Sequence, residues 1–172
     1  EVELPFYGFN HVDLQTGHAD GVGGDYNRWL EAKYPNSQSL KGPENALTHD
    51  YTAAQAWRTA IPEELYPTSY ITEKSIEYLE GHVKEGEGKP FFMMMSYPDP
   101  HHPFTPPGKY WNMYKPEEMS LPDSFFTNTP PPLNVAWAHQ RREDGNQITN
   151  SQGLFAAADE QEVREVMALT CG

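Results

Sequence analysis

The feature that most limits how this chain can fold is an apolar run, FFMMMS, at residues 91–96. Pro90 precedes the run and Pro98 follows it, and proline disfavours a continuous helix because it lacks an amide hydrogen and clashes with the preceding turn. A short run that is apolar at nearly every position is typical of a strand covered on both faces, as in a parallel sheet. One turn of a buried helix is the alternative, but the flanking prolines favour the strand.

Apolar residues recur at helical spacing in three other segments. The first covers residues 26–34 and stops at Pro35, and the second, TSYITEKSIEYLEGHVKEG, covers residues 68–86 and ends in glycines just before the apolar run. The third covers residues 159–171, with Asp159 as its N-cap. A helix, a glycine-rich turn and a buried strand in succession predict an α/β fold.

Length and charge limit the class of protein. A chain of 172 residues is long enough for one domain with a real core. The net charge of -13, with only 12 Lys and Arg, argues against binding of nucleic acid or of an anionic membrane surface. No apolar run approaches the roughly 18–20 residues that a membrane span needs. An anionic small substrate stays open, because it responds to the local field of a cleft.

Cys171 is the single cysteine, so the chain can form neither an intrachain disulfide nor a zinc site built from thiolates. The opening residues, EVELPFYGF, lack the basic and then apolar pattern of a signal peptide. The chain also begins without Met, so the sequence leaves the compartment unknown.

The turn after the apolar run carries Asp99, His101 and His102 between closely spaced prolines. In open α/β sheets, ligands bind beyond the carboxyl ends of the strands, which is where this turn is expected. Proline restricts its own φ and the residue before it, so the turn is stiff enough to position a catalytic group. A histidine there could donate to an oxyanion or act as a general acid. The alternative is that both histidines are ordinary loop residues hydrogen-bonded to backbone.

Metal binding by these residues is not expected, because adjacent histidines seldom converge on one ion and no fourth ligand is evident. The early segment HVDLQTGHADGVGGDY, residues 11–26, also holds histidines and acids among glycines. Its spacing does not fit an EF-hand loop, and GVGG is not a dinucleotide-binding motif. We expect a surface turn in that segment. The residues concerned are His11, Asp13, His18, Asp20 and Asp25.

The helix TSYITEKSIEYLE followed by GKPFFMMMSYPDPHHPFTPPGKYWNMYKPEEMSLPDSF strongly resembles the sulfatase family of the alkaline-phosphatase-like superfamily. In these enzymes a KPFF-type apolar strand and an H-x-P motif lead into a proline-rich loop with a P-x-x-Y phrase. The opening PFYGFNHVDLQTGHADGVGGDYNRWL resembles a segment of one arylsulfatase-like subgroup, and ALTCG resembles the start of a helix that precedes an aspartate pair in relatives.

The resemblance implies a fold with a few strands of a mixed sheet, flanked by helices and long proline-rich loops. It implies one partial sulfatase domain over residues 1–172. Within it we expect a helix and strand body at 1–126, an irregular excursion at 127–158 and the start of a helix at 159–172. In the family the H-x-P histidine reaches the sulfate ester and helps to bind or protonate it. That position is His101 here, so His101 is the expected catalytic and substrate-binding residue, with His102 and Asp99 as supporting substrate-binding residues.

The departures from the family are equally informative. Sulfatases generate their formylglycine nucleophile in a C-x-P-x-R motif, and they hold calcium or magnesium with an early aspartate pair and a later Asp-Asn or Asp-Gln pair. None of these motifs is found in this sequence. We therefore expect an internal fragment that needs no cofactor by itself and is inactive alone. The intact calcium-dependent family enzyme would use formylglycine and the metal to hydrolyse a sulfated small molecule or carbohydrate. The family is consistent with a periplasmic or secreted location.

Two other functions are open. A phosphoester or phosphonate hydrolase of the same superfamily would share the segment and differ at the nucleophile. A non-catalytic carbohydrate- or protein-binding module would instead use exposed aromatic residues such as Tyr110, Trp111 and Tyr114. Unpaired strands of a partial sheet also predict a homo-oligomer formed through exposed sheet edges.

Overall fold

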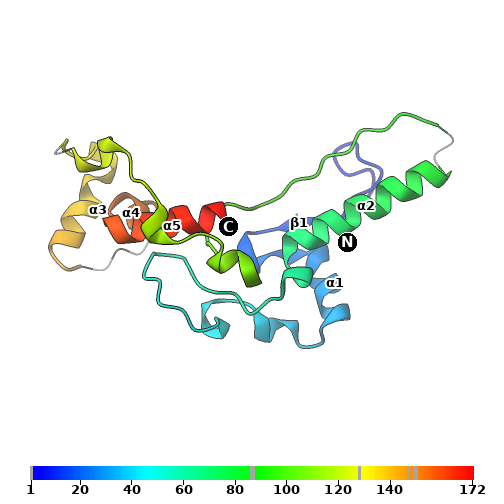
Figure 1. Ribbon diagram of the computed structural model, residues 1–172. Coiled ribbons are helices and arrows are strands. Elements are labelled where there is room, and N and C mark those ends of the chain that lie inside the picture. The colour runs from blue at the N-terminus through cyan, green and yellow to red at the C-terminus, as the bar shows by residue number, and fades with distance from the viewer. Residues whose placement is uncertain (1, 86–87, 128, 147, 149–150) are drawn as a thin grey trace. The chain divides into compact units, whose positions relative to one another are not determined.

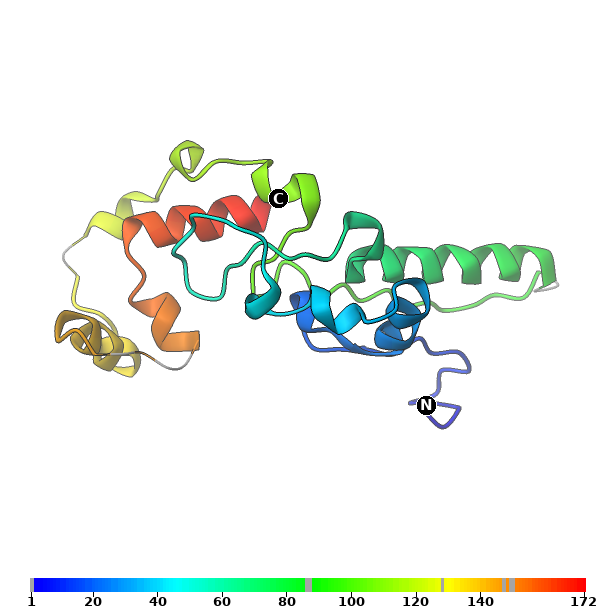
Figure 2. The ribbon, with the colours of Figure 1, turned by 90° about the horizontal axis from the view of Figure 1, so that it is seen from below.

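The computed structural model describes residues 2–85, 88–127, 129–146, 148 and 151–172 (Figures 1 and 2). The chain forms two compact units, which are Glu1–Leu47 with Thr59–His102 (unit 1) and Thr48–Arg58 with Pro103–Gly172 (unit 2). Helices dominate the described residues and the sheet is small, which is compatible with a segment of an α/β fold.

Unit 1 contains a small antiparallel sheet and two helices. The sheet pairs β1 (Gln15–Thr16) with β2 (Gly23–Gly24), and the helices are α1 (Asp25–Lys33) and α2 (Pro67–Glu85). Short 3-10 turns lie between these elements at Ala19–Gly21, Ser37–Leu40, Pro43–Asn45 and Glu63–Leu65.

The junction between β2 and α1 depends on Gly24, which has a φ of +74°. A Cβ at this position would lie 2.3 Å from the carbonyl oxygen of Leu14, so a side chain does not fit. Asp25 accepts a hydrogen bond from the Leu14 N–H through Oδ2 at 2.7 Å, and its own N–H donates to the Leu14 carbonyl at 2.7 Å. The sheet is thereby held closely against the start of α1.

The core of unit 1 forms where α1 and α2 meet. Val22, Tyr26 and Leu30 pack with Tyr70 of α2, and all four are buried. Tyr26 and Leu30 lie one helical turn apart, so they share the face that points into the core. The Tyr26 hydroxyl donates to the Leu65 carbonyl at 2.8 Å, which satisfies its one polar group. The two predicted helices are thus confirmed with slightly shifted bounds, as α1 at Asp25–Lys33 and α2 at Pro67–Glu85; residue 86 of the predicted range lies outside the described residues.

After α2 the chain turns back and runs alongside the helix (Figure 2). The Phe91 ring packs against His82 and Tyr78 of α2, with ring centroids 4.4 and 6.0 Å apart. The Phe92 ring lies 5.9 Å from that of Phe9, near the N-terminus. These ring contacts fix the direction of the returning segment but cover only part of its apolar surface.

The prediction of a buried strand at 91–96 is wrong in this structure. No described residue pairs with this segment as a strand, and Phe92 and Met94 are 75% and 68% exposed. The physical reason is that a strand is completed by hydrogen bonds to a neighbouring strand, and β1 and β2 are only 2 residues long each. The apolar run therefore stays solvent-exposed although its composition is that of a core strand.

Unit 2 is helical. It contains α3 (Leu133–Glu143), α4 (Ser151–Ala156) and α5 (Glu160–Cys171), with 3-10 turns at Gly108–Asn112, Pro116–Glu118 and Asp123–Phe126. The predicted terminal helix is confirmed, and Asp159 caps it by accepting the Glu162 N–H at 2.9 Å. Residues 127–158, expected to be irregular, hold α3 and α4. In α3 the half-buried Val135 and the buried Ala138 share one face, a pattern that the polar sequence around them obscures.

A buried carboxylate joins α5 to a distant segment of unit 2. Glu165 is 2% exposed, and its Oε2 accepts the N–H groups of Thr52 and Ala53 at 2.8 and 2.7 Å. The Oε1 of Glu165 accepts a hydrogen bond from Nε2 of Gln161 at 3.0 Å. These hydrogen bonds join α5 to backbone that lies more than 110 positions earlier in the chain, with separations of 113 for Thr52 and 112 for Ala53.

Trp111 is the aromatic centre of unit 2. It is 3% exposed and packs against the rings of His49 and Tyr51, with centroids 5.2 and 5.1 Å away. An exposed platform made by Tyr110, Trp111 and Tyr114 is therefore not present, because its middle ring lies inside. The Cys171 thiol is exposed on the last turn of α5. None of the described helices combines the length and the apolar character needed to cross a membrane.

Candidate functional site

The turn that follows the apolar run belongs to unit 1 and is closed by a hydrogen bond from the His101 N–H to the Pro98 carbonyl at 3.1 Å. Asp99, His101 and His102 all lie in this turn, as the sequence indicates. They do not lie at the end of a paired strand, because residues 91–96 form none. The turn is instead fixed by its own hydrogen bond and by contacts with α2.

Backbone contact orients the His101 ring. Its Nδ1 donates to the carbonyl oxygen of the next residue, His102, since a carbonyl can only accept. The neutral ring therefore carries its proton on Nδ1, and Nε2 is the nitrogen left to meet a ligand. The His101 side chain is exposed. This arrangement suits a histidine that binds or protonates a group arriving from solvent.

A third histidine completes a stack. The His18 ring, from the turn before Ala19–Gly21, lies face to face with His101, with centroids 3.8 Å apart and an angle of 11° between the planes. On the other side, His102 stacks on His101 at 4.1 Å and 27°. Three imidazoles from two parts of unit 1 thus lie in one contact group, which we call the histidine stack.

Asp99 borders the histidine stack from the α2 side. Its Oδ2 accepts the Thr68 hydroxyl, from the first turn of α2, at 3.1 Å. Burial raises the pKa of Asp99, while the Thr68 hydrogen bond and the nearby His18 act in the opposite direction. Burial also lowers the pKa of His102, and His101 and His18 lower it further. The stack is therefore electrostatically coupled as well as packed.

The segment at residues 11–26, which the sequence predicts to be a surface turn, is exposed at some positions and buried at others. His18 is exposed and joins the stack, whereas Asp20 is fully buried. The Asp20 Oδ2 accepts the Thr59 hydroxyl at 3.0 Å and the Gly42 N–H at 3.2 Å. Sequence reasoning missed His18 because its partner lies 83 positions further along the chain and no local pattern links them. Within the part of the chain that the structure describes, no group of three or more His, Cys, Asp or Glu side chains is placed to hold a metal ion.

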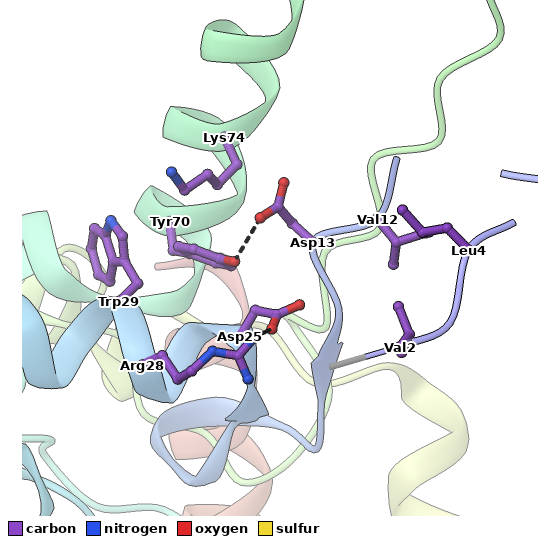
Figure 3. Close-up of a pocket in the computed structure, with 9 residues that line it drawn as sticks. All are labelled: Val2, Leu4, Val12, Asp13, Asp25, Arg28, Trp29, Tyr70 and Lys74. Atoms are coloured by element: carbon purple, nitrogen blue, oxygen red, sulfur yellow. Dashed lines mark hydrogen bonds and ion pairs between the residues drawn. The ribbon is translucent and has the colours of Figure 1, made fainter. Parts of the chain in front are cut away.

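Unit 1 also has a pocket of about 520 Å³ beside α1 and α2 (Figure 3). Its polar lining is largely occupied by internal pairs: the Tyr70 hydroxyl donates to Asp13 at 3.3 Å, and Arg28 pairs with Asp25. Burial and the nearby Asp13 raise the pKa of Tyr70, so this phenol stays protonated. The pocket contains neither His101 nor His18. The remaining lining residues are Val2, Leu4, Val12, Trp29 and Lys74.

Comparison with curated proteins confirms the sulfatase resemblance. The chain is 32% identical over 144 residues to the multifunctional alkaline phosphatase superfamily protein PehA of Trinickia caryophylli, a match that covers 80% of this chain. It is 30% identical over 133 residues to an arylsulfatase of Clostridium perfringens and 29% identical over 120 residues to the human iduronate 2-sulfatase, covering 76% and 69% of this chain. The matches cover 26%, 24% and 21% of the relatives, so the chain spans about a quarter of their length. No protein-family model and no solved structure matches it.

Proposed function

The chain is similar over most of its length to sulfatases and to an alkaline phosphatase superfamily protein, and on that basis we propose that it is the part of a sulfuric ester hydrolase that binds the sulfate group through His101. The observation that supports this most directly is the orientation of His101. The Nδ1 of His101 donates a hydrogen bond to the His102 carbonyl, so Nε2 of this exposed ring is the nitrogen that can contact the substrate. The natural substrate is then a sulfated small molecule or carbohydrate.

The chemistry of His101 follows from its protonation state. When protonated, the ring donates from Nδ1 to backbone and from Nε2 to an oxyanion, and a hydrogen bond between two charged groups is roughly twice as strong as a neutral one. The same Nε2 proton can pass to the ester oxygen as the sulfur–oxygen bond breaks, which avoids release of a free alkoxide. His102 supports this role through the carbonyl that orients His101. Asp99 supports it through its charge beside the histidine stack.

The metal and the formylglycine of sulfatases do not fit the described residues. The described side chains form no metal-binding cluster, and no C-x-P-x-R motif, which formylglycine formation uses, occurs within residues 1–172. We assign no step to either group in this chain. The chain alone is therefore proposed to bind sulfate and sulfate esters without hydrolysing them.

The test measures binding and turnover separately. Isothermal titration of the 172-residue chain with 4-nitrophenyl sulfate at pH 6 is expected to show binding that His101→Asn weakens about tenfold or more, since the hydrogen bond from the imidazole to the charged sulfate group is lost. His82→Asn is the matched control, because His82 also lies in unit 1 and contacts a backbone carbonyl. Release of 4-nitrophenol with calcium present is expected to stay at the rate without protein. Equal binding by the wild-type chain and His101→Asn would refute the proposed role of His101.

A phosphoester or phosphonate hydrolase is the second candidate, because one relative is named as a multifunctional alkaline phosphatase superfamily protein. Titration with 4-nitrophenyl phosphate under the same conditions separates the two. Tighter binding of the sulfate ester favours the sulfatase, whereas a preference of about tenfold for the phosphate ester favours the second candidate. A non-catalytic aromatic module is disfavoured by the burial of Trp111.

A further inference from the structure

Two stacked imidazoles differ from other aromatic ring pairs because both rings can take up a proton and become positively charged. His18 and His101 lie 3.8 Å apart and nearly parallel, and His102 extends the stack on the far side of His101. As these rings take up protons, like charges come within a few ångströms of one another and repel. An anion bound at the shared edge of the rings would offset that repulsion. Protonated rings stacked in this way therefore favour a ligand of negative charge.

We propose that His18 is a second oxyanion-binding residue, which holds the sulfate group together with His101. The inference rests on the proposed function of His101 and adds a residue from a separate segment of unit 1. Because the planes are nearly parallel, the edges of the two rings lie side by side at about their stacking distance. Nitrogens at that spacing can reach two oxygens of one tetrahedral oxyanion, so the sulfate group receives two donors in place of one.

The charges around the stack agree with this role. Asp99 interacts electrostatically with His18, and His102 interacts with both His101 and His18. Asp20 is close in sequence, but its Oδ2 accepts hydrogen bonds from Thr59 and Gly42 in the interior. Asp99, which is partly buried, thus lies beside the stack of three imidazoles. Once the rings are protonated, the net charge at the stack is positive, which favours a bound sulfate.

The test replaces His18 by a ring that can stack but cannot donate. Titration of the full chain with sodium sulfate at pH 6 is expected to show binding about tenfold weaker for His18→Phe than for the wild type, because one hydrogen bond to the charged sulfate is lost. Repeating the titration in buffers of different ionisation enthalpy gives the number of protons taken up with sulfate, which should fall in the variant. His11→Phe is the matched control, since the His11 ring also lies against an aromatic ring, that of Tyr78 at 5.2 Å. It is expected to bind sulfate as the wild type does.

A measurement without ligand shows whether the stack exists in solution. Burial, His101 and, to a smaller extent, His18 lower the pKa of His102, so NMR titration of His18→Phe should show a somewhat higher pKa for His102 than the wild type does. An unchanged pKa of His102 would show that the stack is absent and would overturn the inference.

The failures of the two proposals are distinguishable. If only His101→Asn weakens sulfate binding while His18→Phe binds with wild-type affinity and proton uptake, the function proposed for His101 stands and that of His18 is refuted. If the wild-type chain binds no sulfate, both are refuted. Loss of affinity in both variants, with less proton uptake in His18→Phe, supports both proposals.

Discussion

Replacing Glu165 by alanine removes the carboxylate that joins α5 to residues 52 and 53. Two backbone N–H groups, at 2.8 and 2.7 Å from Oε2, would lose their acceptor in a region where Glu165 is 2% exposed. A hydrogen bond to a charged group contributes roughly 1.5–3 kcal/mol, so two contribute about 3–6 kcal/mol. Removing the charge also removes the cost of burying it, which offsets part of that loss. The expected loss in free energy of unfolding is therefore about 3 kcal/mol.

The measurement combines urea unfolding with amide hydrogen exchange. Glu165→Gln keeps an acceptor oxygen without the charge, and it should cost about 1–2 kcal/mol. Glu160→Gln is the matched control on the same helix, since Glu160 is exposed and pairs with Arg164 at the surface. Such a pair contributes about 0.5 kcal/mol. Exchange should accelerate at the amides of Thr52 and Ala53 in both Glu165 variants and stay unchanged in the control.

The reasoning would be refuted by a Glu165→Ala variant that unfolds within about 0.5 kcal/mol of the wild type, the range of an ordinary surface substitution. It would also be refuted if the two amides kept their protection while the rest of unit 2 lost it. Either result would mean that the carboxylate does not hold the segment at residue 52 against α5 in solution.

Three further outcomes are expected. Gly24→Ala should lower the free energy of unfolding by about 2–3 kcal/mol, because φ is +74° and a Cβ would meet backbone at 2.3 Å, whereas Gly21→Ala, with nothing within 4 Å, should be nearly neutral in the same urea assay. Because the folded state lowers the pKa of His102 below its ordinary 6.5, stability should rise with pH up to that value, and His102→Gln should flatten the rise in thermal melts between pH 5 and 7. The exposed apolar run should cause self-association, so the double variant Phe92→Lys, Met94→Lys should scatter light as a smaller particle than the wild type. Equal masses at matched concentration would contradict this prediction.

The helices were predictable from sequence because their signals are local. The spacing of Tyr26 and Leu30, the stop at Pro35 and the cap at Asp159 all act within one or two turns of the helix that they define. No distant residue needs to be known for any of them. The same local character explains why α2 starts at Pro67, only two or three residues before the start that an N-cap at Thr68 or Ser69 predicts.

The strand and the histidine stack were not predictable in the same way. The apolar run at 91–96 indicates that its side chains favour burial. Whether its backbone pairs as a strand depends on a neighbouring strand, which the run itself does not reveal. The sequence predicts a surface turn at His18, and nothing in that segment indicates a contact with His101. The ring contact between His18 and His101, 83 positions apart, depends on how the turn before Ala19–Gly21 and the turn at 97–102 are brought together. That is a property of tertiary packing rather than of either sequence segment.

The exposed thiol at the end of α5 affects how association of this protein should be measured. With a single cysteine, two copies can join through one Cys171–Cys171 disulfide, and the product would have the mass of a dimer held by the apolar run. A reducing agent would cleave the disulfide and leave the apolar contact intact. Comparing the mass with and without reducing agent therefore distinguishes a disulfide-linked dimer from one held by the apolar run. The same thiol offers one chemically unique attachment point for a fluorophore on unit 2, leaving the histidine stack unmodified.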